Sequence, residues 1–425
     1  MNVRSGPCAA PPPPFRTWVG TRNVWHACLP LLLLAWLALA CNPSHPDVPP
    51  STAPSLFALE GVDRRAAESP SLVVGGEAAL PLDRVGGAVF FGDGVAIANG
   101  GTNEIIVVDS LGETVASWGR TGLGPGEYRW LAGIARNGEG LLLWDESLRR
   151  LTRLDREGRT LGSAQVTPPQ WGRVRLVGAL GERALLQIWF QGFRGEGMAG
   201  PTLVRHPEEF LMVSLSDGAV LSRKSLLGEE QWARREATEG PHGGIPVLFG
   251  RTASAAVAGG RAFIGDTDSL SLWSVDDGGE ELGLVFPLDR TPVRPEWVSA
   301  ARDTLRARFD ATQPGELFLA DGRNFLMAGA EFRRGLLQDL PVRETLPAFS
   351  SMLGGADGSL WIRGYPHPLQ EEVVWVSFDE SLQPLGKVAL PVSFRVLDIA
   401  PDRVLVLERG PFDEHLVAVY PIEQR

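Results

Sequence analysis

From about residue 70 to the C-terminus, short apolar or alternating runs recur, and each ends at glycine, aspartate, asparagine or proline. One unit repeats six times: a strand-like run ends in an acidic or polar turn, and a second run leads away from it. These turn residues readily adopt the positive φ that hairpins require, so the pattern predicts antiparallel strands. The six marking runs are Ile105–Asp109, Leu151–Asp155, Leu211–Leu215, Leu272–Val275, Val373–Phe378 and Leu416–Tyr420.

A further strand with its own turn precedes most of these units, as at Val95–Ala98 and Leu141–Trp144. Each repeat therefore holds three or four antiparallel strands in roughly 40–50 residues, which is typical of a propeller blade. Six units predict an all-β, six-bladed β-propeller over residues 70–425, although this length also suits seven or eight blades. We expect Leu72–Val74 to complete the sheet of the sixth blade, because ring closure hides the edges of a repeat array.

The longest stretch without such a unit runs from residue 277 to residue 379, between the fourth and fifth units. Pro295 suits the first turn of a helix, and four apolar residues about four apart follow it on one helical face. A second, weaker helical pattern runs from about residue 324 to residue 338. We therefore predict a small helical insertion at about residues 294–340, packed on the propeller. The four apolar residues of the first helix are Trp297, Ala301, Leu305 and Phe309.

The first 40 residues are typical of an export signal. They carry three arginines and no acidic residue, and an apolar run extends from Leu29 to Ala40. A membrane-spanning helix takes about 20 apolar residues, whereas a run of this length suits a signal peptide. We predict a signal peptide at residues 1–40 and a tether rich in proline and serine at residues 41–69.

All three cysteines lie within the first 41 residues, and Cys41 follows the apolar run directly. The segment Leu37–Cys41 resembles the lipobox of bacterial lipoproteins, in which the cysteine is lipidated, although Ala38 stands where leucine is usual. Ala38-Leu39-Ala40 also satisfies an ordinary signal-peptidase site. We expect a lipoprotein anchored through Cys41 in the bacterial cell envelope, on a periplasmic or surface face. Without lipidation the protein would be secreted.

Charge narrows the range of partners. The chain has 40 basic and 51 acidic residues, and removal of residues 1–40 would change the formal charge from −11 to −14. An acidic surface argues against binding to nucleic acid or to an anionic membrane face. We expect the partner to be a protein, peptide or glycan of the envelope, with the lipid anchor as the contact to the membrane.

The sequence lacks the usual catalytic and zinc-binding patterns. It contains no G-x-S-x-G, no H-E-x-x-H and no cysteine pair beyond residue 41. Gly195–Gly200 matches G-x-G-x-x-G, but Pro201 follows it and no βαβ pattern surrounds it, which favours a loop over a dinucleotide site. We therefore predict no catalytic residue, no metal ligand and no cofactor.

Five tryptophans fall inside strand-like runs, where packing between blades accounts for them: Trp118, Trp144, Trp273, Trp361 and Trp375. Trp130 beside Arg129, and Trp232 beside two arginines, fall in predicted loops. We name Arg129, Trp130 and Trp232 as candidates for contacts to a glycan or peptide; the alternative is that they anchor their own loops.

The segment Gly119–Tyr128 reads G-R-T-G-L-G-P-G-E-Y and resembles a G-x-G-P-G-E-F segment of bacterial six-bladed β-propellers of the NHL-like and TolB-like kind. The segments Leu346–Phe349 and Asp357–Trp361 resemble the same group. Many members look like predicted lipoproteins without an assigned activity, so the resemblance implies a fold and a cellular location but little function. The Gly-Pro-Gly run itself suits a tight connection between neighbouring blades.

These observations favour an exported binding or scaffold module over an enzyme. The alternative is a calcium-dependent lactonase-like propeller, which would hold the metal in its central channel with Asp, Glu and Asn oxygens. Asparagine is scarce in the propeller region, where the four residues are Asn99, Asn103, Asn137 and Asn324. A purely structural role in an envelope complex is a third possibility.

Overall fold

The computed structural model describes residues 56–76, 80–168, 172–189, 201–235, 242–276, 278–279, 281–285, 290–311, 316–318, 324–326 and 330–424. Cys41, the predicted signal peptide and Gly195–Gly200 lie outside these residues. Among the helices within the described ranges, none is long and apolar enough to cross a membrane.

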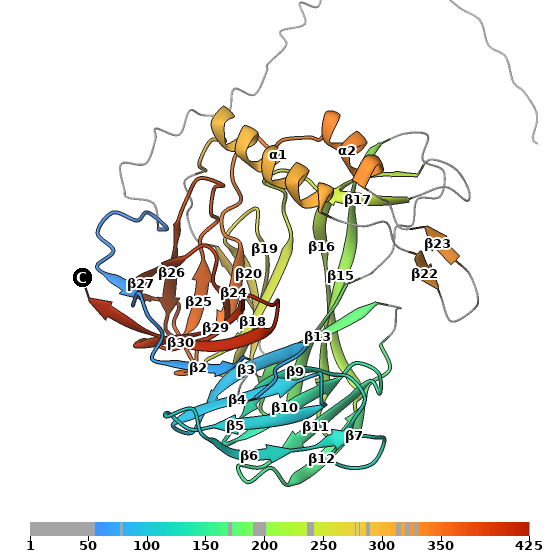
Figure 1. The fold of residues 1–425 in the computed structure, drawn as a ribbon, viewed down its shortest axis with the longest axis vertical. Coiled ribbons are helices and arrows are strands. Elements are labelled where there is room, and N and C mark those ends of the chain that lie inside the picture. The colour runs from blue at the N-terminus through green and yellow to red at the C-terminus, as the bar shows by residue number, and fades with distance from the viewer. Residues whose placement is uncertain are drawn as a thin grey trace, which may run out of the picture. The chain divides into compact units, whose positions relative to one another are not determined.

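Most of the described chain is β-structure in meanders of consecutive antiparallel strands (Figure 1). The first sheet contains β3 (Val85–Phe91), β4 (Gly94–Asn99), β5 (Glu104–Val108) and β6 (Thr114–Trp118). The parallel pair β7 (Arg120–Thr121) and β8 (Glu127–Tyr128) follows it. The second sheet contains β9 (Leu131–Asn137), β10 (Gly140–Asp145), β11 (Arg150–Leu154) and β12 (Thr160–Gln165).

The third and fourth sheets continue the pattern, and the third gains an extra strand. The third sheet contains β13 (Arg173–Leu180), β14 (Arg183–Trp189), β15 (Thr202–Ser214), β16 (Val220–Arg235) and β17 (His242–Pro246). The fourth sheet contains β18 (Ala253–Ala258), β19 (Arg261–Asp266), β20 (Ser271–Asp276) and β21 (Glu281–Val285).

The last two sheets join the two ends of the described chain. The fifth contains β24 (Ser351–Gly354), β25 (Leu360–Arg363), β26 (Glu372–Phe378) and β27 (Pro384–Pro391). The sixth contains β28 (Arg395–Ile399), β29 (Arg403–Arg409), β30 (His415–Gln424) and β2 (Leu72–Gly75). Because β2 pairs antiparallel with β30, with Leu72 opposite Val419, the prediction that Leu72–Val74 completes the last sheet is confirmed. Every strand predicted from a repeat unit is the third strand of its sheet.

The apolar core is divided among the spaces between neighbouring sheets. In β4, Val95 and Ile97 pack toward the sixth sheet, whereas Ala96 and Ala98 pack toward the second. Similar clusters lie between each other pair of consecutive sheets. Strands covered on both faces explain why these runs are apolar throughout. The first strands β3, β9, β13, β18, β24 and β28 also contact one another in cyclic order. The sheets are therefore arranged as in a β-propeller.

Two helices separate the fourth sheet from the fifth. They are α1 (Pro295–Asp310) and α2 (Ala330–Gln338), with the hairpin β22 (Glu316–Phe318) and β23 (Asn324–Leu326) between them. Trp297 and Phe309 are buried on one face of α1, and α2 packs against β16 and β17. The weaker helical pattern was predicted to begin near residue 324; residues 324–326 instead pair with residues 316–318 as a strand.

A short strand, β1 (Arg64–Ala66), lies inside the segment predicted to be tether. It pairs antiparallel with β30 and makes one parallel pair with β27, Arg65 with Ala389, so it connects the fifth and sixth sheets. Val62 is buried in the same core as the fourth and fifth sheets. The predicted boundary at residue 69 is therefore too late. The alternation that marks a strand is too short here to be recognised in the sequence.

Candidate functional site

The segment Gly119–Tyr128 connects the first and second sheets, as its glycines suggested. Glu127 holds it together: its carboxylate accepts hydrogen bonds from the amides of Leu123 (3.0 Å) and Gly124 (2.8 Å) and from Arg120 (2.7 Å). The Gly124 amide and the Arg120 side chain lower the pKa of Glu127 below its ordinary value. These contacts give the motif a structural role.

Arg129 and Trp130 lie directly before β9, in a rigid corner. The amide of Arg129 donates to the buried carboxylate of Asp145 at 2.7 Å, and the amide of Glu146 donates to the Trp130 carbonyl at 2.9 Å. The Trp130 side chain keeps 36% of its surface exposed, and the Arg173 guanidinium lies 5.5 Å from its ring centroid. Their role in ligand contact stays a prediction.

Trp232 was predicted to lie in a loop, but it belongs to β16, where it is paired with Leu203 and Ile245. Its side chain packs against the cluster that joins β17 to the two helices. The third sheet is longer than an ordinary blade because β15 and β16 are long strands, and β16 contacts α2. Trp232 therefore packs β16 against the two helices, and Arg129 and Trp130 lie elsewhere in the unit.

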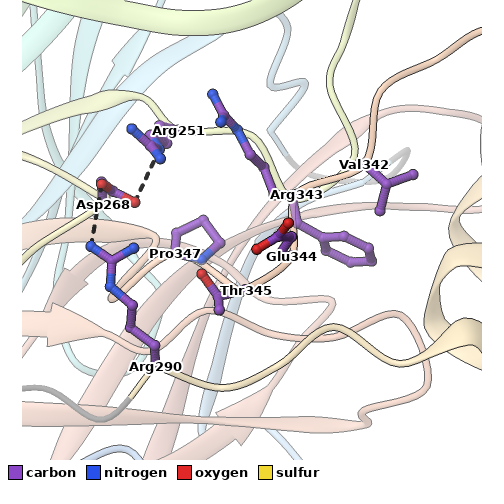
Figure 2. A pocket seen from close by; sticks show the side chains of 9 residues that line it. Arg251, Asp268, Arg290, Val342, Arg343, Glu344, Thr345 and Pro347 are labelled. Carbon is purple, nitrogen blue, oxygen red and sulfur yellow. Dashed lines mark ion pairs between the residues drawn. The ribbon is translucent and has the colours of Figure 1, made fainter. Parts of the chain in front are cut away.

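The candidate site is a pocket of about 450 Å³, lined in part by the segments that precede α1 and follow α2. Figure 2 shows the side chains that line it. Four segments that are distant in sequence form it: the connection between the third and fourth sheets, the turn between β19 and β20, and the segments on either side of α1 and α2. The lining residues are Phe249, Arg251, Asp268, Arg290, Val342, Arg343, Glu344, Thr345 and Pro347.

Backbone pairing holds the segment after α2 between its neighbours. The Val293 amide donates to the Glu344 carbonyl at 2.8 Å, and the Leu346 amide donates to the Thr291 carbonyl at 2.9 Å. On the other side Leu248 and Val342 form a parallel bridge. Because the lining segments are cross-linked through their main chains, their side chains project from a defined frame.

Phe249 adds an unusual backbone conformation to this frame. Its φ is +58°, a region that bulky residues seldom occupy and that costs on the order of 1–3 kcal/mol. Its side chain is buried and meets Tyr365 edge-on, with ring centroids 6.5 Å apart, while the Gly250 amide closes the turn onto the Val247 carbonyl at 3.0 Å. Packing thus fixes the turn that places Arg251.

Ion pairs organise the charged lining. Asp268 lies between Arg251 and Arg290, with N–O distances of 3.0 Å and 3.6 Å (Figure 2). Arg343 donates through Nε to Glu230 at 2.9 Å, and Glu230 is 1% exposed. Burial acts to raise the pKa of Glu230, but hydrogen bonds from Arg343 and the Arg251 amide lower it overall. Glu230 is therefore a buried carboxylate that stays ionised.

Charges of both signs are balanced in this pocket. Three arginines face it, Asp268 and Glu344 provide two carboxylates, and Glu230 lies behind as the third. Arg290 keeps 58% of its side chain exposed, so it has donors available to a ligand. The pocket can therefore present cationic donors and anionic acceptors to a polar ligand. Its residues are spread from Phe249 to Pro347, and no sequence motif links them.

The lactonase-like alternative requires at least three converging oxygen ligands. Over the described ranges, no group of three or more His, Cys, Asp or Glu side chains is placed to hold a metal ion. Asn99 and Asn103 serve local structure instead: Asn99 Oδ1 accepts from the Asp83 amide at 3.1 Å, and Asn103 Oδ1 accepts from the Leu131 amide at 3.1 Å. Both asparagine side chains are therefore already engaged by main-chain amides.

No family model and no curated protein matches the chain. Similar solved structures include an exported protein of Bacteroides fragilis, with 9% identity and a TM-score of 0.40, covering 85% of this chain and 96% of that chain. A member of the DUF4221 family from Bacteroides vulgatus has 10% identity and a TM-score of 0.43, covering 85% and 99%. Virginiamycin B lyase from Staphylococcus aureus has 9% identity and a TM-score of 0.33, covering 80% and 97%. At these values the similarities assign neither ligand nor activity.

Proposed function

We propose that this protein is an exported, lipid-anchored, six-bladed β-propeller that acts as a binding or scaffold module in the bacterial cell envelope. Six successive meanders with first strands in cyclic contact support the blade count. The helices between β21 and β24 then form an insertion on the propeller. The N-terminal segment before Cys41, which carries arginines and no acidic residue, supports export. The proposed relationship of the protein to NHL-like propellers rests on Gly119–Tyr128.

The pocket carries the binding part of this proposal. Its charges are balanced, its frame is cross-linked by main-chain hydrogen bonds, and Arg290 and Glu344 are exposed on its lining. A ligand group that combines an ammonium with a carboxylate matches both signs, as at the ends of a short peptide. We infer that a peptide is the envelope component the pocket receives, and an uncharged glycan is the competing candidate.

Titration calorimetry tests this assignment with triglycine as a zwitterionic probe and diacetylchitobiose as an uncharged glycan. We expect triglycine to bind, and both Arg290→Ala and Glu344→Ala to weaken it by about tenfold, since a charged hydrogen bond contributes roughly 1.5–3 kcal/mol. Arg306→Ala is a suitable control, because Arg306 pairs with Asp303 on the exposed face of α1. Binding of the glycan alone, or equal loss in the control, would contradict the peptide assignment.

Anchoring has its own test. Cell fractionation of the wild type beside Cys41→Ala should move the protein from the membrane fraction to the soluble envelope or the medium. A variant that stays with the membrane would refute the lipid anchor and leave the binding proposal unaffected.

A further inference from the structure

The first strands of the six sheets carry an excess of positive charge, whereas the whole chain carries an excess of negative charge. The chain has 51 acidic and 40 basic residues, yet the six first strands contain four arginines and one carboxylate. The arginines are Arg136, Arg173, Arg175 and Arg395, and the carboxylate is Asp398.

Contacts near their starts show that these strands run side by side in the same direction. A Cβ on Gly86, the second residue of β3, would lie 2.7 Å from the carbonyl oxygen of Leu131, the first residue of β9. The Met352 amide in β24 donates to the Ser254 hydroxyl in β18 at 3.0 Å, and both are the second residues of their strands.

Contacts near their ends give the same result. A Cβ on Gly178 of β13 would lie 2.7 Å from the Cβ of Val257 in β18. The Phe90 amide in β3 donates to the Asp398 carboxylate in β28 at 2.8 Å. A Cβ on Gly133 of β9 would lie 3.1 Å from the Cβ of Leu176 in β13, and both residues are in the first half of their strands. These five contacts connect all six first strands in parallel, so all six begin at one end of the folded unit.

The single carboxylate of these strands is already neutralised. Asp398 is 2% exposed, it accepts from the Phe90 and Ile399 amides, and it is ion-paired with Arg136. Arg136 also donates to the Gly355 carbonyl at 3.0 Å. This pair joins the first, second, fifth and sixth sheets, so its role is structural. It leaves three arginines of the first strands without a carboxylate from the same strands.

Arg173 and Arg395 are the first residues of their strands, Arg175 is the third of β13, and all three side chains are exposed. Arg175 donates to Gln187 Oε1 at 2.5 Å, a neutral partner. Removal of water by the surrounding protein lowers the pKa of Arg175, while the charge of Glu208 acts against this. Arg175 is thus accessible to solvent but surrounded by protein atoms, and an anion near it would stabilise the guanidinium.

The nearby carboxylates on other strands have partners of their own. Glu208 accepts from Gln187, and Glu146 accepts from the Trp144 indole at 2.7 Å and is paired with Arg149 at 3.1 Å. They reduce the positive charge around Arg173 and Arg175, but their acceptor positions are partly occupied. The arginines keep guanidinium donors that suit bidentate binding of an oxyanion.

We propose that the end of the unit where the first strands begin binds a ligand with two or more oxyanion groups, through Arg173, Arg175 and Arg395. This anion site is separate from the pocket and does not depend on its peptide assignment. Carboxylates and phosphates share the required chemistry, and the choice between them is made by the probe that binds.

Calorimetry with inorganic pyrophosphate and with citrate tests the proposal on the purified protein. We expect at least one probe to bind, with affinity falling as salt is raised, and Arg175→Gln and Arg395→Gln to weaken it by about tenfold each. Arg156→Gln is the matched control, because Arg156 is exposed in the turn between β11 and β12 and pairs with Glu139 at 4.0 Å. It should change the affinity by less than about twofold.

The thermal unfolding midpoint of Arg395→Gln controls for a folding artefact. A midpoint near that of the wild type would show that the variant is folded. If neither probe binds, or if Arg156→Gln weakens binding as much as Arg395→Gln, the anion site is refuted. Citrate binding without pyrophosphate binding would assign a polycarboxylate, and the reverse a phosphorylated ligand. Loss of triglycine binding in Arg290→Ala leaves this result unchanged, so the two assignments can fail separately.

Discussion

Two groups of arginines in this protein are arranged in opposite ways. In the pocket, Arg251, Arg290 and Arg343 are matched by an equal number of carboxylates. At the starts of the first strands, Arg173 and Arg395 have no carboxylate partner from those strands, and the nearby carboxylates of Glu146 and Glu208 already accept hydrogen bonds from Trp144 and Gln187. Arginine content alone therefore does not define a ligand. The balance of charge around the arginines separates a site for a zwitterionic group from a site for an anion.

The comparison extends to the buried carboxylate near each group. Asp398 is 2% exposed and Glu230 is 1% exposed, and each is paired with one arginine. Asp398 ties four sheets together, whereas Glu230 supports one wall of a pocket that solvent enters. We therefore expect the two pairs to differ in how much stability they contribute.

The largest effect is expected when the arginine of the central pair is removed. Arg136→Ala should lower the free energy of unfolding by about 3–5 kcal/mol, because it leaves a buried carboxylate without its cation. Arg343→Ala should cost less, about 1–3 kcal/mol, since water in the pocket can solvate Glu230. Urea unfolding at pH 7 measures both losses of stability. A larger loss for Arg343→Ala than for Arg136→Ala would contradict the expected difference between the two ion pairs.

Close approach of the main chains at the centre predicts the next effect. A Cβ on Gly354 would lie 1.8 Å from the Val257 carbonyl oxygen, so Gly354→Ala should cost about 1–3 kcal/mol through forced displacement of β24 from β18. Gly283→Ala on β21 is the control, because nothing lies within 4 Å of its added Cβ, and its effect should stay within about 1 kcal/mol. Equal effects would show that the first strands are not tightly packed.

The pH dependence of stability should have opposite signs at the two carboxylates. Burial raises the pKa of Asp398 above 3.8. Burial also acts to raise the pKa of Glu230, but the hydrogen bonds from Arg343 and the Arg251 amide and the charges of both arginines together lower it below 4.5. Glu230 therefore contributes stability that is present above pH 4.5 and is lost as pH falls through its lowered pKa. Asp398 behaves in reverse: its ionisation costs stability as pH rises from 3.8 through its raised pKa.

Denaturant unfolding of Glu230→Gln and Asp398→Asn between pH 3 and pH 7 tests these signs. The stability difference between wild type and Glu230→Gln should shrink on acidification. The corresponding difference for Asp398→Asn should shift in favour of the wild type on acidification. Parallel trends in the two variants would contradict the assigned pKa directions.

The smallest effect on stability is expected at the pocket rim. Arg290 pairs with Asp268 at 3.6 Å and is 58% exposed, so Arg290→Ala should change the free energy of unfolding by less than about 0.5 kcal/mol. Chemical denaturation checks this value beside the triglycine titration. A large loss of stability would mean that Arg290 supports the fold. Weaker triglycine binding by Arg290→Ala would then not identify Arg290 as a ligand contact.

Much of the β-structure could be predicted from the sequence because it is local. Turn residues after apolar runs located the third strand of every sheet, and the residues Leu72–Val74 were assigned to the last sheet. Spacing of apolar residues also located α1, whose Trp297 and Phe309 are buried. These signals depend on residues within one turn or one strand.

The features that depend on distant segments could not be predicted in this way. Trp232 looked like a loop residue because β16 is unusually long, and β1 is only three residues. The pocket joins residues as distant as Arg251 and Arg343, which no local pattern relates. The arginines of the first strands are visible in the sequence, but their shared position follows only from the cyclic contacts of the strands.

The most direct test of the central claim is a calorimetric titration of two variants with two probes. We predict that Arg290→Ala no longer binds triglycine but still binds the oxyanion probe, pyrophosphate or citrate, that the wild type binds. We also predict that Arg395→Gln no longer binds the oxyanion but still binds triglycine. If one variant loses both probes while it remains folded, the two groups of arginines form a single site, and the distinction between a balanced pocket and an anion site is wrong.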